Sequence, residues 1–269
     1  MSSDPAGEGP RLLVRVEDRC AWLTLNRPER LNALDAESFR ALDACIDELA
    51  ARDDVAVVVL TGAGRAFCAG ADLRSIMEDI DVSDPHAVRA YLRFVGSVVR
   101  KLVTLEKPTI AAVNGPAVGG GCNLALACDL VLVHEHAVLG QVYTQRALVP
   151  DMGGTYFLPR LVGRARAFEL AYFGDPVTAA EAAAIGLVNR CVPAGEFEQT
   201  VQDWAARLAT GAGRALGLVK TGLLASPLFD LDAALEWEAN AIALSFETDD
   251  LREALAAFRE KRPPRYTGR

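Results

Sequence analysis

The chain is poor in histidine and has no excess of positive charge, and both absences exclude classes of protein. It has 3 histidines among 269 residues, which is few for an enzyme that binds a metal through imidazole. His134 and His136 would face the same side of an extended strand, but two ligands do not make a metal site. The 28 lysines and arginines against 36 aspartates and glutamates give a net charge of −8, which argues against a broad surface for nucleic acid. We therefore expect neither a metal nor a nucleic-acid partner.

Cysteine pairs, a membrane span and a secretion signal are also absent. The 6 cysteines form no C-x-x-C pair and lie mostly among apolar residues, which is typical of a reduced, cytoplasmic chain. Cys122 stands near an expected helix start that favours a thiolate, but we prefer a buried, small hydrophobic role for it. The uncharged stretch 108–128 contains prolines, asparagines and glycines, so we expect no membrane-spanning helix. Residues 1–10 have no signal-peptide pattern and are predicted to be a disordered tail.

Three familiar motifs are missing as well. The dinucleotide-binding fingerprint G-x-G-x-x-G lacks its third glycine in both glycine-rich segments, at Phe67 and at Leu124. No Gly-Lys dipeptide is present to build a phosphate-binding P-loop. No G-x-S-x-G motif occurs either, which argues against a serine hydrolase with a nucleophile elbow.

What the sequence does have is an alternation of strand-like and helix-like segments. Two apolar runs around a polar turn predict a hairpin at residues 12–16 and 21–25. A continuous apolar run at 55–60 predicts a strand that is buried on both faces. Other strands are expected at 109–113, 130–133 and 137–139, and helices at 35–51 with Asp35 as N-cap, 72–80, 88–102 and 119–128. This pattern predicts an α/β core at residues 11–194 and a helical C-terminal region at 195–269.

Two glycine-rich loops, at residues 61–72 and 114–123, each lead from an expected buried strand into a helix. The first turn of a helix has backbone N–H groups without helical partners. If two such groups converged, they would form an oxyanion hole, and glycine would let a carbonyl approach closely. The alternative is that these glycines only allow tight turns and close packing between helix and strand.

An ordered set of motifs spans about residues 12–266 and resembles the crotonase superfamily, the enoyl-CoA hydratase/isomerase family. Each motif alone is weak, but together and in this order they are highly specific. They are NRP at 26–28, LNAL at 31–34, FCAGAD at 67–72, KPTIAAVNG at 107–115, GGGCNLALACD at 119–129, PDMGGT at 150–155 and AFREKRP at 257–263.

The resemblance implies a crotonase-like spiral of ββα units, a helical C-terminal trimerisation region, and homotrimers that often pair into hexamers. It implies an acyl-CoA substrate, with no cofactor apart from the coenzyme A of the thioester. The thioester oxygen would be held by the backbone N–H groups of Ala71 and Gly120 while an enolate forms. The surrounding substrate contacts would come from Ala69, Gly70, Asp72, Leu73, Gly119, Gly121, Asn123 and Tyr143, with Asp72 also capping its helix.

The sequence departs from the family pattern at two catalytic positions. Hydratases of the family carry two glutamates that activate a water, and here these positions hold Asn123 and Tyr143. Neither is a carboxylate base at neutral pH. Asp151 is the remaining candidate, as a general acid/base or a nucleophile, since some family members use an aspartate at this place. The alternative is that Asp151 caps a helix that runs to about Leu161.

A single carboxylate suits a proton shuttle between two carbons, so we expect an acyl-CoA isomerase of double-bond or ring-acyl type. The alternatives are a hydratase with atypical residues, an Asp-nucleophile hydrolase or dehalogenase, and a non-catalytic acyl-CoA-binding protein. Arg30 and Lys261 are the predicted contacts of the coenzyme A phosphates. A solvated helix end is the alternative for the basic cluster around Lys261. The region around residues 76–95 is expected to set acyl selectivity.

Overall fold

The computed structural model describes residues 9–268, and of the predicted tail at residues 1–10 only Gly9 and Pro10 fall within this range, where both are exposed and lie in no helix or strand. The strands are β1 (Leu12–Glu17), β2 (Cys20–Leu25), β3 (Val57–Gly62), β4 (Thr109–Val113), β5 (Ala117–Val118), β6 (Leu130–His134), β7 (Val138–Gly140), β8 (Val177–Thr178) and β9 (Arg190–Val192). The helices are α1 (Ala36–Ala51), α2 (Leu73–Asp79), α3 (Pro85–Thr104), α4 (Gly120–Leu126), α5 (Gly154–Phe173), α6 (Ala179–Ala184), α7 (Phe197–Ala209), α8 (Gly213–Ala225), α9 (Leu231–Ser245) and α10 (Asp249–Glu260). Short 3-10 turns lie at Pro28–Arg30, Thr144–Arg146, Ala194–Glu196 and Ser226–Leu228.

The strands form one large and one small sheet. The large sheet has the order β1-β2-β3-β4-β6-β9, in which β1 and β2 are antiparallel and every other neighbouring pair is parallel. The predicted hairpin is confirmed, and its turn residues Asp18 and Arg19 both have positive φ, as tight hairpin turns require. In the small sheet, β5-β7-β8, only β7 matches an expected strand, the one at 137–139. Its strands have only two or three residues, too few for a periodic apolar pattern.

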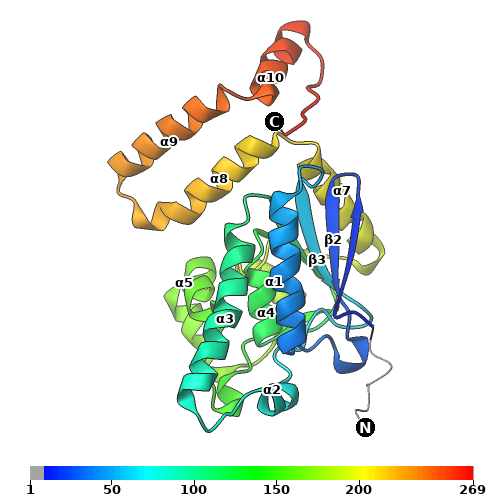
Figure 1. Ribbon diagram of the computed structural model, residues 1–269, viewed down its shortest axis with the longest axis vertical. Helices are drawn as coiled ribbons and strands as arrows, with labels where there is room; N and C mark the ends of the chain where they lie inside the picture. Colours follow the sequence, from blue (N-terminus) through cyan, green and yellow to red (C-terminus); the bar gives the residue numbers. More distant parts are fainter. Residues whose placement is uncertain (1–8, 269) are drawn as a thin grey trace, which may run out of the picture.

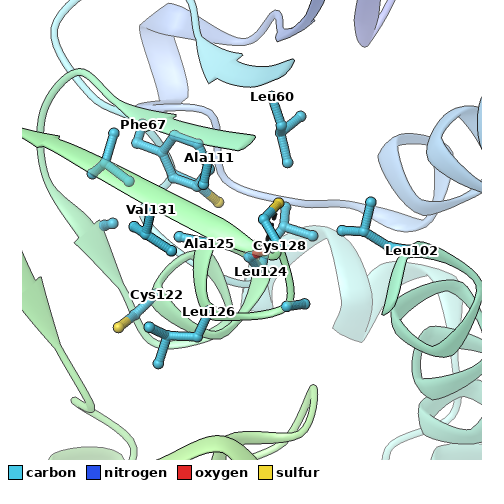
Figure 2. Packing of buried hydrophobic residues seen from close by; sticks show 14 of the residues in the cluster. Leu60, Phe67, Leu102, Ala111, Cys122, Leu124, Ala125, Leu126, Cys128 and Val131 are labelled. Carbon is cyan, nitrogen blue, oxygen red and sulfur yellow. Dashed lines mark hydrogen bonds between the residues drawn. The ribbon is translucent and has the colours of Figure 1, made fainter. Parts of the chain in front are cut away.

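The large sheet is covered on both faces. Val58 and Leu60 of β3 belong to a core with α1, α3 and α4, whereas Val57 and Val59 pack against α7. The strand therefore has the two buried faces that its apolar run predicts, although it begins two residues later than expected. Figure 2 shows the side chains of α4 packed among Leu60, Leu102, Ala111 and Val131.

Most predicted helices are confirmed, and α5 is the main difference. It runs to Phe173, whereas the sequence predicted an end near Leu161. Pro159 and Gly163 explain the short prediction, because both residues normally end or bend a helix. The chain does bend here, since Gly163 has non-helical angles and the helix continues beyond it.

The C-terminal region divides in two. Helix α7 packs on the sheet through Phe197, Val201, Ala205 and Ala209. Helices α8, α9 and α10 instead extend from the body as an arm, with α8 and α9 side by side (Figure 1). The boundary at 194/195 stays a prediction, but α7 shares the core of the sheet that precedes it.

A buried charge network ties the first part of the chain to the loop before α2. The Arg27 guanidinium contacts Asp35 at 3.3 Å and Asp72 at 3.0 Å, and it donates to the Ala33 carbonyl at 2.7 Å. Burial raises the pKa of Asp35, but hydrogen bonds from Ser38 and the charges of Arg27 and Arg11 lower it by more, so the pKa lies below its usual 3.8. A lowered carboxyl pKa adds stability above the usual value and loses it as the pH falls through the folded-state pKa. We therefore expect this contribution to fade below about pH 4.

Replacing Arg27 tests this network. Arg27→Met removes the cation that the buried Asp35 and the partly buried Asp72 share. Because Arg11 still pairs with Asp35 at 3.0 Å, we expect the free energy of unfolding in urea to fall by about 3 kcal/mol, the low end for a broken buried pair. The matched control is Arg15→Met, whose ion pair with Glu17 is exposed, with side chains 62% and 58% accessible. Its loss should stay below about 1 kcal/mol. Equal losses for the two variants would contradict a stabilising role of the buried network.

Candidate active site

The first glycine-rich loop leads from β3 to α2 and presents the backbone N–H of Ala71. Ala71 forms a parallel bridge with Leu34. In that bridge, the Leu34 N–H donates to the Gly70 carbonyl at 2.8 Å and the Asp72 N–H donates to the Leu34 carbonyl at 2.9 Å. Because the flanking residues make both bonds, the N–H of Ala71 itself points away from Leu34. Within residues 9–268 it donates to no acceptor.

Asp72 holds the end of this loop. Its carboxylate accepts a hydrogen bond from the Ser75 N–H at 3.3 Å, so it caps α2 as the sequence suggests. The other carboxylate oxygen pairs with Arg27. Asp72 thus has two protein partners and fixes the chain next to the Ala71 amide. The neighbouring Ala69 is half-buried with its N–H bonded to the Leu31 carbonyl, and Leu73 is the exposed first residue of α2.

The second glycine-rich loop contains β5 and ends at Gly120, the first residue of α4. The Gly119 N–H donates to the Gly140 carbonyl at 2.8 Å, and Gly119 has a φ of +55°, which favours glycine. The Gly120 N–H has no helical partner because it lies in the first turn. No other acceptor in the described part of the chain receives it.

The two loops contact each other directly. Cys68 forms a parallel bridge with Ala117 of β5. A Cβ on Gly121 would lie 2.2 Å from the Cys68 carbonyl oxygen, so only glycine permits this approach. A Cβ on Gly120 would lie 3.9 Å from the Ala71 nitrogen. The two unpaired amides are therefore close together, as an oxyanion hole requires.

A chain of buried polar side chains ends at Asp151. The Gln141 Nε2 donates to Asn123 Oδ1 at 2.8 Å. The Asn123 Nδ2 donates to the Tyr143 hydroxyl at 3.0 Å and to the Asp151 carbonyl at 2.8 Å. The Tyr143 hydroxyl donates to Asp151 Oδ1 at 2.6 Å. Met152, the residue after Asp151, has its sulfur 2.8 Å from where a Cβ of Gly120 would lie, so this turn borders the second loop.

The environment shifts both titrating groups of this chain. Burial raises the pKa of Asp151 above its usual value, by more than the hydrogen bond from Tyr143 lowers it. Burial and the adjacent Asp151 carboxylate raise the pKa of the Tyr143 phenol. The phenol therefore stays protonated at neutral pH and serves as a donor. A raised carboxyl pKa is what a proton-transferring group at near-neutral pH needs.

Comparisons with known proteins identify the family of the chain. The sequence profile described as enoyl-CoA hydratase/isomerase matches residues 15–269. The chain belongs to the enoyl-CoA hydratase/isomerase family. The resemblance seen in the motifs is thereby confirmed, and the protein is an enzyme of a family that acts on acyl-CoA.

The relatives of this chain include proteins named as isomerases and proteins named as hydratases. The chain is 38% identical over 258 residues to a 1,2-epoxyphenylacetyl-CoA isomerase of Escherichia coli, which covers 96% of this chain and 98% of the relative. It is 37% identical over 252 residues to a short-chain-enoyl-CoA hydratase of Clostridium acetobutylicum, covering 93% and 95%. Among solved structures, an enoyl-CoA hydratase of Bacillus anthracis superposes with a TM-score of 0.90 at 35% identity over 96% of this chain and 100% of that one. The predicted crotonase-like fold is confirmed by this match.

The two residues predicted to contact coenzyme A, Arg30 and Lys261, lie far apart in one chain. Arg30 is exposed in the 3-10 turn after β2. Lys261 is exposed at the C-cap of α10, which lies at the opposite end of the molecule from α2 (Figure 1).

The predicted cap role of Asp151 is not observed. Gly153 is the N-cap of α5 and no side chain caps this helix, whereas the Asp151 carboxylate bonds to Tyr143. Gln141 is the residue of this cluster that sequence analysis missed. Its side chain is 2% exposed, yet nothing in its flanking sequence marks it, because glutamine is usually a surface residue.

Other expectations have simpler outcomes. Burial raises the pKa of the Cys122 thiol to about 12, which fits the buried hydrophobic role that we preferred. Within the described range, no group of three or more His, Cys, Asp or Glu side chains is arranged to hold a metal ion. None of the helices at residues 9–268 is long and apolar enough to cross a membrane. An open cleft is lined by Met152 and Gly153 and by α3 from Gly96 onward, so it begins just beyond the region predicted to set acyl selectivity.

Proposed function

We propose that this protein is an acyl-CoA isomerase that moves a double bond or rearranges a ring-derived acyl group through a thioester enolate. The observation that carries the proposal is the environment of Asp151. Its carboxylate is paired with the neutral phenol of Tyr143 and lies beside the amide of Asn123, and these are the two positions where the family resemblance implies glutamates in hydratases. The name of the Escherichia coli relative, an epoxyphenylacetyl-CoA isomerase, supports the same class of reaction.

The reaction needs one base and one site for negative charge. Asp151, as a carboxylate, removes a proton from the carbon next to the thioester carbonyl, and the electron pair moves onto the carbonyl oxygen. The N–H groups of Ala71 and Gly120 stabilise that oxygen. The protonated Asp151 then returns the same proton to another carbon, and the carbonyl reforms. Atoms balance without water, which is why a second carboxylate is not needed.

Binding of coenzyme A completes the proposal. In this reaction coenzyme A takes part only as the thioester of the substrate, and no further cofactor is needed. Arg30 and Lys261 are proposed to contact the phosphates, with Lys261 contributed by a neighbouring subunit. Six cysteines without a disulfide suit a reducing, cytoplasmic setting for such an enzyme.

A substrate panel tests this function. Purified protein is incubated with 3-enoyl-, 2-enoyl- and ring-type acyl-CoA thioesters in D2O, and products are followed by mass spectrometry and NMR. We expect double-bond migration or ring rearrangement, with little added water. Net hydration of 2-enoyl-CoA would instead identify a hydratase. A covalent adduct on Asp151 in intact-protein mass spectra would indicate nucleophilic catalysis, and tight thioester binding without turnover would indicate a binding protein.

We also propose that the arm assembles the chain into a homotrimer, alone or as a dimer of trimers. Its helices expose many large apolar side chains in a single chain, which would favour burial in an interface. They include Val219, Leu223, Leu228, Leu231, Leu235, Ile242, Leu244, Phe246 and Phe258, with exposed fractions from 45% to 85%.

Sedimentation velocity tests the assembly. We expect the mass of three or six chains, and we expect the double variant Leu235→Glu with Ile242→Glu to sediment as a smaller species because charges would enter the interface. Leu13→Glu is the matched control, since Leu13 is 44% exposed on β1, away from the arm. A monomeric wild-type protein would rule out the trimer.

A further inference from the structure

Three buried side chains next to Asp151 donate hydrogen bonds to one another, to the turn that carries Asp151 and, from Gln141, to the Cys122 sulfur. The exposed fractions of Asn123, Gln141 and Tyr143 are 0%, 2% and 7%. Both N–H bonds of the Asn123 amide are donated, one to Tyr143 and one to the Asp151 carbonyl. The single O–H of Tyr143 is donated to Asp151 Oδ1. Neither residue keeps a donor for the substrate contact that the sequence predicts.

The hydrogen bonds from Gln141 through Asn123 and Tyr143 to Asp151 all run in one direction. Asn123 Oδ1 accepts from Gln141 Nε2 and Asn123 Nδ2 donates to the Asp151 carbonyl, and these two bonds together fix which end of the Asn123 amide faces Tyr143. The Asn123 N–H then occupies a lone pair of the Tyr143 oxygen, so the hydroxyl proton turns toward Asp151. Such chains polarise each bond in turn and hold the last acceptor in one orientation. No other side chain in the described range bonds to the Asp151 carboxylate, so Oδ2 has no side-chain partner.

We infer that Gln141, Asn123 and Tyr143 are positioning residues that hold Asp151 Oδ1 and leave Oδ2 as the oxygen that exchanges the proton with substrate. This inference rests on the proposed function for its chemical meaning, but the positioning itself can be measured without turnover. It reassigns Asn123 and Tyr143 from substrate contact to control of the base. It also adds Gln141, whose side chain bonds to neither Asp151 nor Tyr143.

The chain also sets the proton affinity of Asp151. The carboxyl is mostly buried, which favours its neutral form, and the Tyr143 hydrogen bond opposes that effect by stabilising the anion. Without Tyr143, more of the protein would hold Asp151 protonated at neutral pH and unable to accept a proton. Tyr143 is thus needed to keep a buried base ionised.

The first test is Tyr143→Phe, which removes the hydroxyl and keeps the ring. In protein labelled with 13C at the aspartate carboxyls, Asp151 is identified by its loss in Asp151→Asn and is titrated by NMR. We expect its pKa to rise by about one unit, the size of a hydrogen bond to a charged group. The acid limb of kcat/KM should move to higher pH by the same amount, while KM changes little. Tyr172→Phe is the matched control, since Tyr172 is 67% exposed on α5, and it should change neither value.

The second test is Gln141→Met, which removes the donor at the start of the chain. We expect the Asp151 pKa to rise in the same direction by a smaller amount, because the Asn123 amide loses one of the two bonds that fix its orientation. The double variant should shift little beyond Tyr143→Phe alone, since Gln141 acts through Tyr143. Additive shifts, or an unchanged Asp151 titration in Tyr143→Phe, would overturn the inference.

The NMR titration distinguishes a failure of the proposed function from a failure of the positioning inference. If no thioester is turned over but the Asp151 titration shifts as expected, the proposed function fails and the positioning chain stands. If turnover occurs and the titration does not respond to Tyr143→Phe, the isomerase stands and the positioning chain fails. Thermal melting of each variant accompanies both arms, and Gln141→Met supplies the titration if Tyr143→Phe does not fold.

Discussion

Asp151→Asn should reduce isomerisation by about 10²–10⁴-fold, the usual contribution of a positioned acid or base. The expected loss is this large because the only carboxylate of the Asn123, Tyr143 and Asp151 group disappears. Asparagine keeps an oxygen that can accept from the Tyr143 hydroxyl, so the surrounding hydrogen bonds should survive. Acyl-CoA affinity, measured by titration calorimetry, should therefore change little.

The control for this variant is Asp175→Asn, an exposed aspartate after α5. It removes the same charge from the chain and should leave turnover unchanged. Exchange of the substrate α-proton with D2O gives a second measurement, since it requires the base but not the rearrangement. Equal turnover by wild type and Asp151→Asn would remove Asp151 from the mechanism.

The pH dependence should follow the same residue. Asp151 acts as a base only when it is ionised, and burial raises its pKa above the usual value. Turnover should therefore fall as the pH drops through this raised pKa, at a higher pH than an exposed aspartate would give. A profile of kcat/KM against pH shows whether the acid limb lies above the usual range.

Much of the backbone could be predicted because its signals are local. The hairpin, α1 with its Asp35 cap, and the doubly buried β3 follow from apolar spacing and capping residues within a few positions. Asp72 was recognised as a cap for the same reason. Strand β7 was expected, but β5 and β8 were missed because they have two residues each, and their pairing with β7 joins partners far apart in the chain.

The site was only partly predictable, for a related reason. The glycine loops with Ala71 and Gly120 stand out because glycine repeats and motif order are visible in sequence. Gln141 does not, because its role depends on the fold bringing β7 against α4, so that its amide reaches Asn123. The positioning role that we propose for Asn123 has the same basis: the sequence shows an amide, and only the contacts show that both of its donors are used.

Gly120→Pro compared with Gly120→Ala measures the value of the second oxyanion donor. Gly120 is the first residue of α4, a position where proline fits a helix well because its missing N–H is not needed by the helix. Proline deletes the N–H that the thioester oxygen would use. Alanine keeps that N–H. Both substitutions add a Cβ that would lie 2.8 Å from the Met152 sulfur, so the Met152 side chain must move in both variants.

Both variants share the contact with Met152. The ratio of their rates therefore measures the effect of losing the residue-120 N–H and the open space in front of it. Loss of one oxyanion donor costs about 10²–10³-fold in kcat, so proline should fall below alanine by at least this factor. The thermal midpoints of the two variants should agree, which would show that α4 is intact in both. Similar turnover by the proline and alanine variants would mean that the Gly120 amide does not hold the developing charge, and the pairing of Ala71 with Gly120 would then serve only to pack the two loops.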